Sequence, residues 1–227
     1  MDEKTLKKII RETLGFEDEK LLEEALVIEP KTFELPTELL TTKNKSAHKE
    51  LYENYVKTFN RVSAKLDTVD KDEANLNHSE YRALKIDETY NSNAAYLHEL
   101  FFNNISDVRS NIAPNSLSYL RLERDWGTFD DWQTDFIASG LSARNGWVIC
   151  GYHLLLQRYI NVVVDLHSVN VPIAFYPIIV VDCWEHSYYK DYLKDRKSYI
   201  YAMMKELNWD IIEKRVNVAE KLQKAMR

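Results

Sequence analysis

Three histidines and one aspartate are placed where they could bind a metal ion. His48 and His98 each lie among apolar residues at helical spacing, and His186 follows Asp182 by four residues, where the most apolar stretch of the chain ends. One histidine on an apolar helix face is more often a buried core residue, but two of them on separate helices favour a shared site. Burying Asp182 without a partner would cost several kcal/mol, and a metal cation is a natural partner for it.

The types of these four side chains distinguish between metals. Three imidazoles and one carboxylate offer three nitrogen ligands and one oxygen ligand, without a thiolate. Such a set is not typical of a structural zinc site. It suits a redox-active first-row metal such as Fe or Mn, with a position left open for water or substrate.

The elements that would position these residues begin with helices. Apolar residues recur at helical spacing over residues 41–66 and again over 94–105, which predicts two amphipathic helices. Residues 116–145 continue the helical pattern. His48 belongs to the first of these helices and His98 to the second, so the two helices would have to pack face to face to bring both imidazoles together.

The second half of the chain changes in character. β-branched and apolar runs predict three strands, at residues 147–152, 159–166 and 173–181. Pro177 interrupts the last run, and residues 188–226 return to a helical pattern. The order of helices, then strands, then helices indicates an α+β fold rather than alternating βαβ units, with a helical N-terminal half and an α/β C-terminal half.

Composition excludes several classes of protein. The chain has 227 residues, with 30 Lys and Arg against 36 Asp and Glu, and a net charge of −6. Its apolar runs fall short of the ~18–20 residues that span a bilayer, and its first four residues lack the apolar core of a signal peptide. The acidic balance argues against nucleic-acid binding. Cys150 and Cys183 fit buried thiols in a reducing compartment, so we expect a cytoplasmic protein without a membrane or nucleic-acid partner.

Residues 1–35 are a charge-rich segment in front of the helical part. Apolar residues recur at helical spacing on both sides of Gly15, which predicts two short helices before Pro30 and Pro36. Such a pair is either an amphipathic element packed on the main body or a docking element through which residues 1–30 bind a protein partner. We therefore expect an N-terminal helical extension, a helical hairpin domain and a C-terminal α/β domain, at residues 1–35, 36–115 and 116–227.

Several motifs of the chain resemble those of one family. The segment that starts at Asp182, DCWEHSYYKDY, resembles the DxWEHAYYxDY signature of the iron/manganese superoxide dismutase family. AYLHELFFNNI at residues 95–105 resembles the family's second-helix motif HxLFWxNL, and HKELYENYV, which begins at His48, resembles its first ligand-bearing helix. Shorter matches to the family's GW, RxxY and NW elements lie at Gly146-Trp147, at Arg196 with Tyr199, and at Asn208-Trp209. The resemblance covers about residues 40–215 and implies a three-stranded antiparallel sheet.

The resemblance implies a metal centre and an activity. The ligands would be His48, His98, Asp182 and His186, the same residues that burial and spacing single out. They would hold one Fe or Mn ion per chain, which cycles between its +3 and +2 states. The substrate would be the superoxide anion, which is disproportionated to oxygen and hydrogen peroxide.

The resemblance also implies catalytic residues around the metal. The family places Gln, or sometimes His, fifteen residues before the ligand aspartate, and His167 has this spacing to Asp182; an ordinary strand-end histidine is the alternative. Tyr55 would donate a hydrogen bond to solvent near the open position, and it would also pack on the helix stripe. Trp147 and Trp184 would form an aromatic wall that keeps the pocket dry.

Two residues of the signature imply a homodimer. In the family, residues matching Glu185 and Tyr189 reach across the dimer interface, the glutamate to the partner's ligand histidine. Arg196 resembles the basic residue that lines the substrate funnel, where positive charge attracts an anion. An exposed helix arginine is the alternative interpretation of Arg196.

The first helix departs from the family pattern. Many members carry His four residues before the tyrosine that matches Tyr55, where this chain has Leu51, and His48 precedes Tyr55 by seven residues rather than the usual eight. Together with the N-terminal extension, these departures favour a second interpretation, a superoxide-dismutase-fold structural or interaction subunit of a larger assembly without catalytic activity. Retention of all four ligands and of His167 favours the enzyme.

Overall fold

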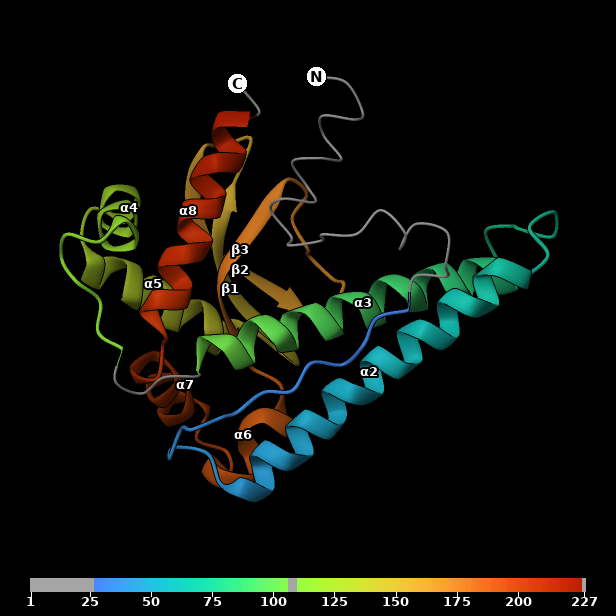
Figure 1. Cartoon of the computed structure of the whole chain (residues 1–227), viewed down its shortest axis with the longest axis horizontal. Helices are drawn as coiled ribbons and strands as arrows, with labels where there is room; N and C mark the ends of the chain where they lie inside the picture. The colour runs from blue at the N-terminus through green and yellow to red at the C-terminus, as the bar shows by residue number, and fades with distance from the viewer. Residues whose placement is uncertain (1–26, 106–109, 226–227) are drawn as a thin grey trace.

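Two long helices, α2 (Thr42–Thr68) and α3 (Glu80–Asn104), form an antiparallel hairpin (Figure 1). The structure is a computed structural model that describes residues 27–105 and 110–225, so the two short helices expected before Pro30 lie almost wholly outside the described residues. Each long helix begins at a side-chain cap: the Thr41 hydroxyl accepts from Asn44 N, and the Ser79 hydroxyl accepts from Arg82 N. The hairpin therefore has the two amphipathic helices that the periodicity predicts.

The buried faces of α2 and α3 meet along the hairpin. Most of the side chains that the two helices bury there recur at intervals of three or four residues, which places them in one stripe on each helix. They include His48, Tyr52 and Val56 on α2, and Ala94, Leu97, His98 and Phe101 on α3. Both histidines therefore lie inside the interface between the helices and not on its rim.

In the described part of the second half, two helices precede a sheet of three strands and three helices follow it. Its elements are α4 (Leu117–Trp126), α5 (Phe129–Ser142), β1 (Gly146–His153), β2 (Arg158–Asp165), β3 (Phe175–Asp182), α6 (Glu185–Tyr192), α7 (Arg196–Lys205) and α8 (Trp209–Ala225). The strands form one antiparallel sheet in the order β2-β1-β3. The prediction of an α+β fold with a three-stranded antiparallel sheet is confirmed.

The sheet brings the end of β3 beside the start of β1. Trp147, the second residue of the central strand, pairs with Asp182 on β3 and with Val164 on β2. The start of β1 therefore contacts both neighbouring strands beside the aspartate. Gly146 is required there because a Cβ atom at this position would lie 2.1 Å from the carbonyl oxygen of Val164. Helices α3 and α8 pack against β3, and α5 packs against β1 and β2.

Pro177 is accommodated by an irregularity in the sheet. Gly151 of β1 pairs with Pro177, but the preceding Cys150 pairs with Ile179, so β3 has one extra residue at this point. A proline has no N–H group for the ladder, and bulges are among the few places in a sheet that tolerate it. The strand predicted over residues 173–181 therefore forms despite the proline.

Residues 27–41 run as an extended segment along the helical hairpin (Figure 1). The side chain of Asn60 exchanges two hydrogen bonds with the backbone of Ile28, at 2.9 and 2.8 Å. The Tyr52 hydroxyl accepts from Lys31 N, and Phe33 packs edge-on against the Tyr52 ring. This segment closes one side of the hairpin core. Among the described helices, none combines the length and apolar character needed to cross a membrane.

Candidate metal centre

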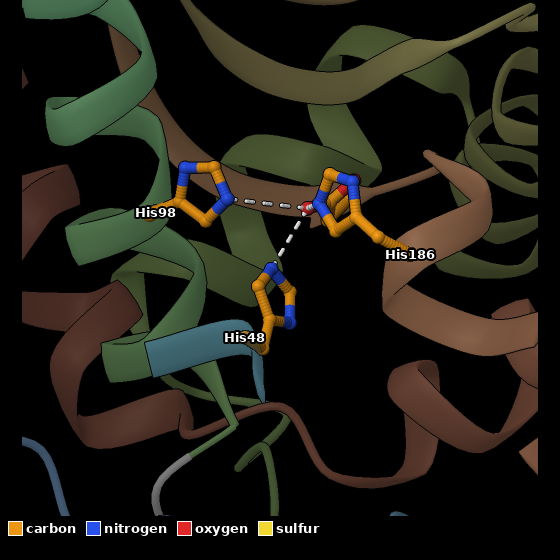
Figure 2. A group of neighbouring side chains, drawn as sticks. His48, His98 and His186 are labelled. Carbon is orange, nitrogen blue, oxygen red and sulfur yellow. Dashed lines mark hydrogen bonds and ion pairs between the residues drawn. The ribbon is translucent and has the colours of Figure 1, made fainter. Parts of the chain in front are cut away.

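Four residues from four elements meet between the hairpin and the sheet. Their candidate ligand atoms all lie within 4.8 Å of one another; they are His48 from α2, His98 from α3, Asp182 from the end of β3 and His186 from α6. Figure 2 shows the three imidazole rings converging from their separate helices. The structure thus brings together the four residues that the sequence singles out.

The turn after β3 brings His186 back to Asp182. Trp184 N donates to Asp182 Oδ1 at 2.8 Å, and the Ser187 hydroxyl donates to the carbonyl oxygen of Asp182 at 3.1 Å. These bonds tighten the chain between the strand and α6, which starts at Glu185. As a result, His186 Nε2 lies 3.1 Å from Asp182 Oδ2.

Burial and mutual charge set the protonation of the cluster. Burial alone would raise the pKa of Asp182, but the adjacent His186 and His48 imidazoles hold it below its ordinary value. Burial lowers the pKa of His48, and it lowers that of His98 well below the ordinary value. Near neutral pH the centre therefore holds an ionised carboxylate and uncharged buried imidazoles, which is the protonation state that a metal cation requires of its ligands.

The tautomer of His98 shows that a cation fits this centre. His98 Nδ1 lies 2.6 Å from the carbonyl oxygen of Ala94, which can only accept a hydrogen bond, so the ring proton sits on Nδ1. His98 Nε2 is then a bare lone pair, fully buried and without a hydrogen-bond partner among the residues that the structure describes, 3.7 Å from Asp182 Oδ2. Two acceptors that face each other in a buried site need a positive ion between them.

A fourth histidine, His167, lies beside the cluster. His167 follows β2 and is completely buried. Trp147 Nε1 donates to His167 Nδ1 at 3.0 Å, and His167 Nε2 lies 3.1 Å from the Tyr55 hydroxyl. Because an indole can only donate, Nδ1 is an acceptor, and because burial lowers the pKa of His167 to about 4, the neutral ring carries its single proton on Nε2. His167 therefore donates to Tyr55.

Aromatic rings surround the ligands. Trp147 meets His98 edge-on at 4.9 Å, and Trp184 stacks on both His167 at 5.1 Å and His186 at 5.7 Å. The side chains of His48, His98 and Asp182 are at most 1% exposed, whereas that of His186 is 25% exposed. Among the candidate ligands, His186 therefore marks the side of the cluster that is open to solvent.

The remaining site residues from the sequence lie farther out. Glu185 and Tyr189 are exposed on α6, next to His186. The Arg196 guanidinium donates to the carbonyl oxygens of Ala143 and Arg144 and lies over the Tyr188 ring. Arg196 therefore ties α7 to the loop between α5 and β1, and it is not one of the residues that meet at the cluster.

Two residues of α3 were missed from the sequence. The Tyr90 ring lies 4.7 Å from that of His167, and Asn93 Nδ2 donates to the carbonyl oxygen of His167 at 2.9 Å. Tyr90 precedes His98 by eight residues, with Ala94 midway between them. Extending the stripe of His98 toward the start of the helix could have found Tyr90.

Comparison with known proteins gives the family. Residues 116–215 match the model of the C-terminal domain of iron/manganese superoxide dismutases. A superoxide dismutase named for Fe from Aquifex aeolicus is 34% identical over 179 residues, which cover 78% of this chain and 83% of that protein. One named for Mn from Halobacterium salinarum is 34% identical over 127 residues, 56% of this chain and 62% of that protein. One named for Mn/Fe from Aeropyrum pernix is 28% identical over 174 residues, 76% of this chain and 80% of that protein.

Three histidines and one aspartate that could hold one metal ion, placed between a helical hairpin and a three-stranded sheet, are typical of a class of metal-dependent oxidoreductases. The chain belongs to the iron/manganese superoxide dismutase family.

Proposed function

We propose that this chain is a superoxide dismutase that binds one Fe or Mn ion through His48, His98, Asp182 and His186. The observation that carries the proposal is the bare, buried Nε2 of His98 facing the Asp182 carboxylate. The reaction joins two superoxide anions and two protons to give one oxygen and one hydrogen peroxide. When bound, the ion would supply one-electron redox chemistry between its +3 and +2 states.

The residues around the metal would supply negative charge, exclude water and donate hydrogen bonds. Asp182 contributes the negative charge of the ligand set, and the uncharged imidazoles leave the rest of the cation's charge available to an anion. Trp147 and Trp184 exclude water from the ligands. His167 donates to the Tyr55 hydroxyl and so fixes its position. The Tyr55 ring lies beside His98, with 5.4 Å between the two ring centres.

The ligand set does not distinguish Fe from Mn, since the relatives that match the chain carry both metals in their names. Selection between these ions rests on the surroundings of the ligands and on metal supply. We propose that either ion fills the site. We also assign the chain to the cytoplasm, where Cys150 and Cys183, both buried free thiols, would stay reduced.

We further propose that the chain forms a homodimer through α6. Glu185 and Tyr189 are exposed there, and Tyr189 shows 53% of its surface. His186 is the ligand with partial exposure on the same helix. A second copy seated on this face would cover the open side of the cluster, so its contact would help to exclude water.

An inactive assembly subunit accounts less well for the centre. Keeping an ionised carboxylate buried among uncharged imidazoles costs folding free energy unless a cation is bound. A structural subunit would gain nothing from that cost. The enzyme would need every one of these groups.

Metal analysis with a matched control tests the proposal. Wild type, purified without an affinity tag, should hold about one Fe or Mn per chain by mass spectrometry and should consume superoxide. His98→Ala should lose both the metal and the activity, whereas His78→Ala, which removes an exposed histidine at the far end of the hairpin, should keep both. A folded wild type that stays empty after refolding with either ion would refute the proposal.

A further inference from the structure

A group of hydrogen bonds joins helix α6 to the start of helix α2, and each of these helices carries a candidate ligand. Asp191, near the end of α6, accepts all three bonds of this clamp. Its Oδ1 accepts from the Thr41 hydroxyl at 2.7 Å, and its Oδ2 accepts from Thr41 N at 3.0 Å and from Asn44 Nδ2 at 2.9 Å. Figure 1 shows α6 beside the first turns of α2.

The clamp lies close in sequence to the candidate ligand on each helix. Asn44 is buried and precedes His48 by four residues, which is about one helical turn. Asn44 Nδ2 also donates to the carbonyl oxygen of Ser187 at 2.9 Å, and Ser187 directly follows His186. A displacement of α6 against α2 would therefore move His186 relative to His48.

The two imidazoles need a fixed separation, because both meet the same carboxylate oxygen. His48 Nε2 lies 3.0 Å and His186 Nε2 lies 3.1 Å from Asp182 Oδ2, and the two rings lie edge-on at 5.0 Å. The helix that carries His48 has 27 residues, whereas the helix that carries His186 has eight. A helix as short as α6 has little stability of its own, so its position depends on what it contacts.

Electrostatics favours a carboxylate at this place. The first turn of α2 contains no acidic residue, although the N-terminus of a helix carries a partial positive charge that a nearby anion stabilises. Asp191 supplies this anion from another helix. Partial burial would raise the pKa of Asp191, but the hydrogen bonds from Thr41 and Asn44 hold it below its ordinary value. The acceptor is therefore charged near neutral pH, and hydrogen bonds to a charged group are about twice as strong as neutral ones.

We propose that Asp191 is a positioning residue that holds α6 on the start of α2 and thereby keeps His186 and His48 at the separation that one metal ion requires. The inference rests on the proposed function, which supplies the ion. Asp191 acts through the two helices and is not one of the four candidate ligands. Without Asp191 the ligands remain, but part of the binding free energy is lost in bringing α6 back to α2, so the ion binds more weakly.

Metal affinity measures the clamp without any turnover. The metal-free full-length protein is titrated with Mn²⁺ in competition with a chelator at pH 7. Asp191→Ala removes all three bonds, and we expect its Kd for Mn²⁺ to rise about tenfold, the lower end of the ~10–100-fold that residues supporting metal ligands contribute. Asp191→Asn keeps one acceptor oxygen and should recover part of the affinity. The visible absorption of bound Co²⁺ depends on the arrangement of its ligands, so its bands should shift in Asp191→Ala.

Asp195→Ala is the matched control. Asp195 also accepts hydrogen bonds at the start of a helix, from Ser198 N at 3.0 Å and from the Ser198 hydroxyl at 2.7 Å. That helix, α7, carries none of the four candidate ligands. The control should therefore keep the wild-type affinity for Mn²⁺ and the wild-type Co²⁺ spectrum, even where its melting temperature falls.

A double-mutant cycle tests whether the bond between Asn44 and Asp191 is part of the effect. Asn44→Ala should also weaken Mn²⁺ binding. The combination with Asp191→Ala should raise the Kd by less than the product of the two single effects, because both changes remove the same bond. Independent effects of the two changes would overturn the clamp.

The other outcomes separate the clamp from the function. Wild-type affinity for Mn²⁺ in Asp191→Ala would overturn the clamp, as would equal weakening in Asp195→Ala. If Asp191→Ala does not fold, the comparison of Asp191→Asn with Asp195→Asn decides in the same way. A wild type that binds Mn²⁺ but consumes no superoxide would refute the proposed function, and a weaker affinity in Asp191→Ala would still establish the clamp. A wild type that binds no Mn²⁺ would refute both.

Discussion

Replacing His167 with glutamine should remove a pH-dependent part of the stability. Burial lowers the pKa of His167 from 6.5 to about 4, because the fully buried ring cannot be hydrated when it is charged. In the unfolded chain the ring takes up a proton below its ordinary pKa of about 6.5. Between these two values the native protein holds His167 uncharged while the unfolded chain binds a proton, so lowering the pH favours unfolding.

The magnitude follows from the two pKa values. Each pKa unit corresponds to about 1.4 kcal/mol. The difference between 6.5 and about 4 therefore removes about 3 kcal/mol of unfolding free energy as the pH falls from 7 to below 4. Glutamine can still accept from Trp147 Nε1 through its amide oxygen and donate to Tyr55 through its amide nitrogen, so the loss of the titrating group is isolated from the loss of the contacts.

Urea unfolding of wild type and His167→Gln at a series of pH values measures this effect. Whatever the substitution costs at pH 7, wild type should lose about 3 kcal/mol more than the variant on going to acid. Groups common to both proteins cancel in the comparison. His78→Gln, at an exposed position, shows what the loss of a histidine outside the core does. Parallel curves for wild type and His167→Gln would refute the reasoning that His167 is held uncharged by burial.

Other changes test the packing and the metal. Gly146→Ala should cost at least about 1–3 kcal/mol, measured by thermal unfolding, because its Cβ would press on the carbonyl oxygen of Val164. Arg215→Met should lower the unfolding free energy by about 3 kcal/mol in urea titrations, at about 1 kcal/mol for each of three buried acceptors that lose a donor; Arg215→Lys should recover part of it. Asn60→Ala should release residues 27–31 and speed limited proteolysis there, since both bonds to that backbone are lost. Removing the metal should lower the unfolding free energy by about 3 kcal/mol for an ion at 100 times its Kd, and His98→Ala should show no difference between loaded and metal-free forms.

Much of the fold could be predicted from local pattern. The stripes of His48 and His98 have a helical period, and the strand runs before Asp182 are apolar and β-branched, so periodicity alone identifies the elements. The order of these elements then gives the α+β class. Pro177 shows the limit of that approach, because whether a proline ends a strand or sits in a bulge depends on the neighbouring strand, here at Cys150 and Gly151.

The candidate ligands could be predicted from residue type, but contacts between residues far apart in the sequence could not. His98 and Asp182 could be grouped because buried ionisable side chains must find partners. Tyr90 and His167 are 77 positions apart and their contact depends on how α3 packs beside the connection after β2, which no spacing encodes. The same holds for residues 27–41: their path along the hairpin depends on Asn60 and Tyr52, whose side chains reach a backbone about thirty and twenty positions away.

The tautomer of His98 connects the fold to its chemistry. The carbonyl oxygen of Ala94 belongs to the turn of α3 just before His98, so the helix itself decides which ring nitrogen carries the proton. The other nitrogen is turned toward Asp182, which the sheet holds in place against Trp147. Helix and sheet therefore each contribute one acceptor to the same buried space, and neither can relax without breaking its own backbone bonds. A cation at this position would join the two halves of the chain, so the interaction that would stabilise the fold is also the one that would make superoxide chemistry possible.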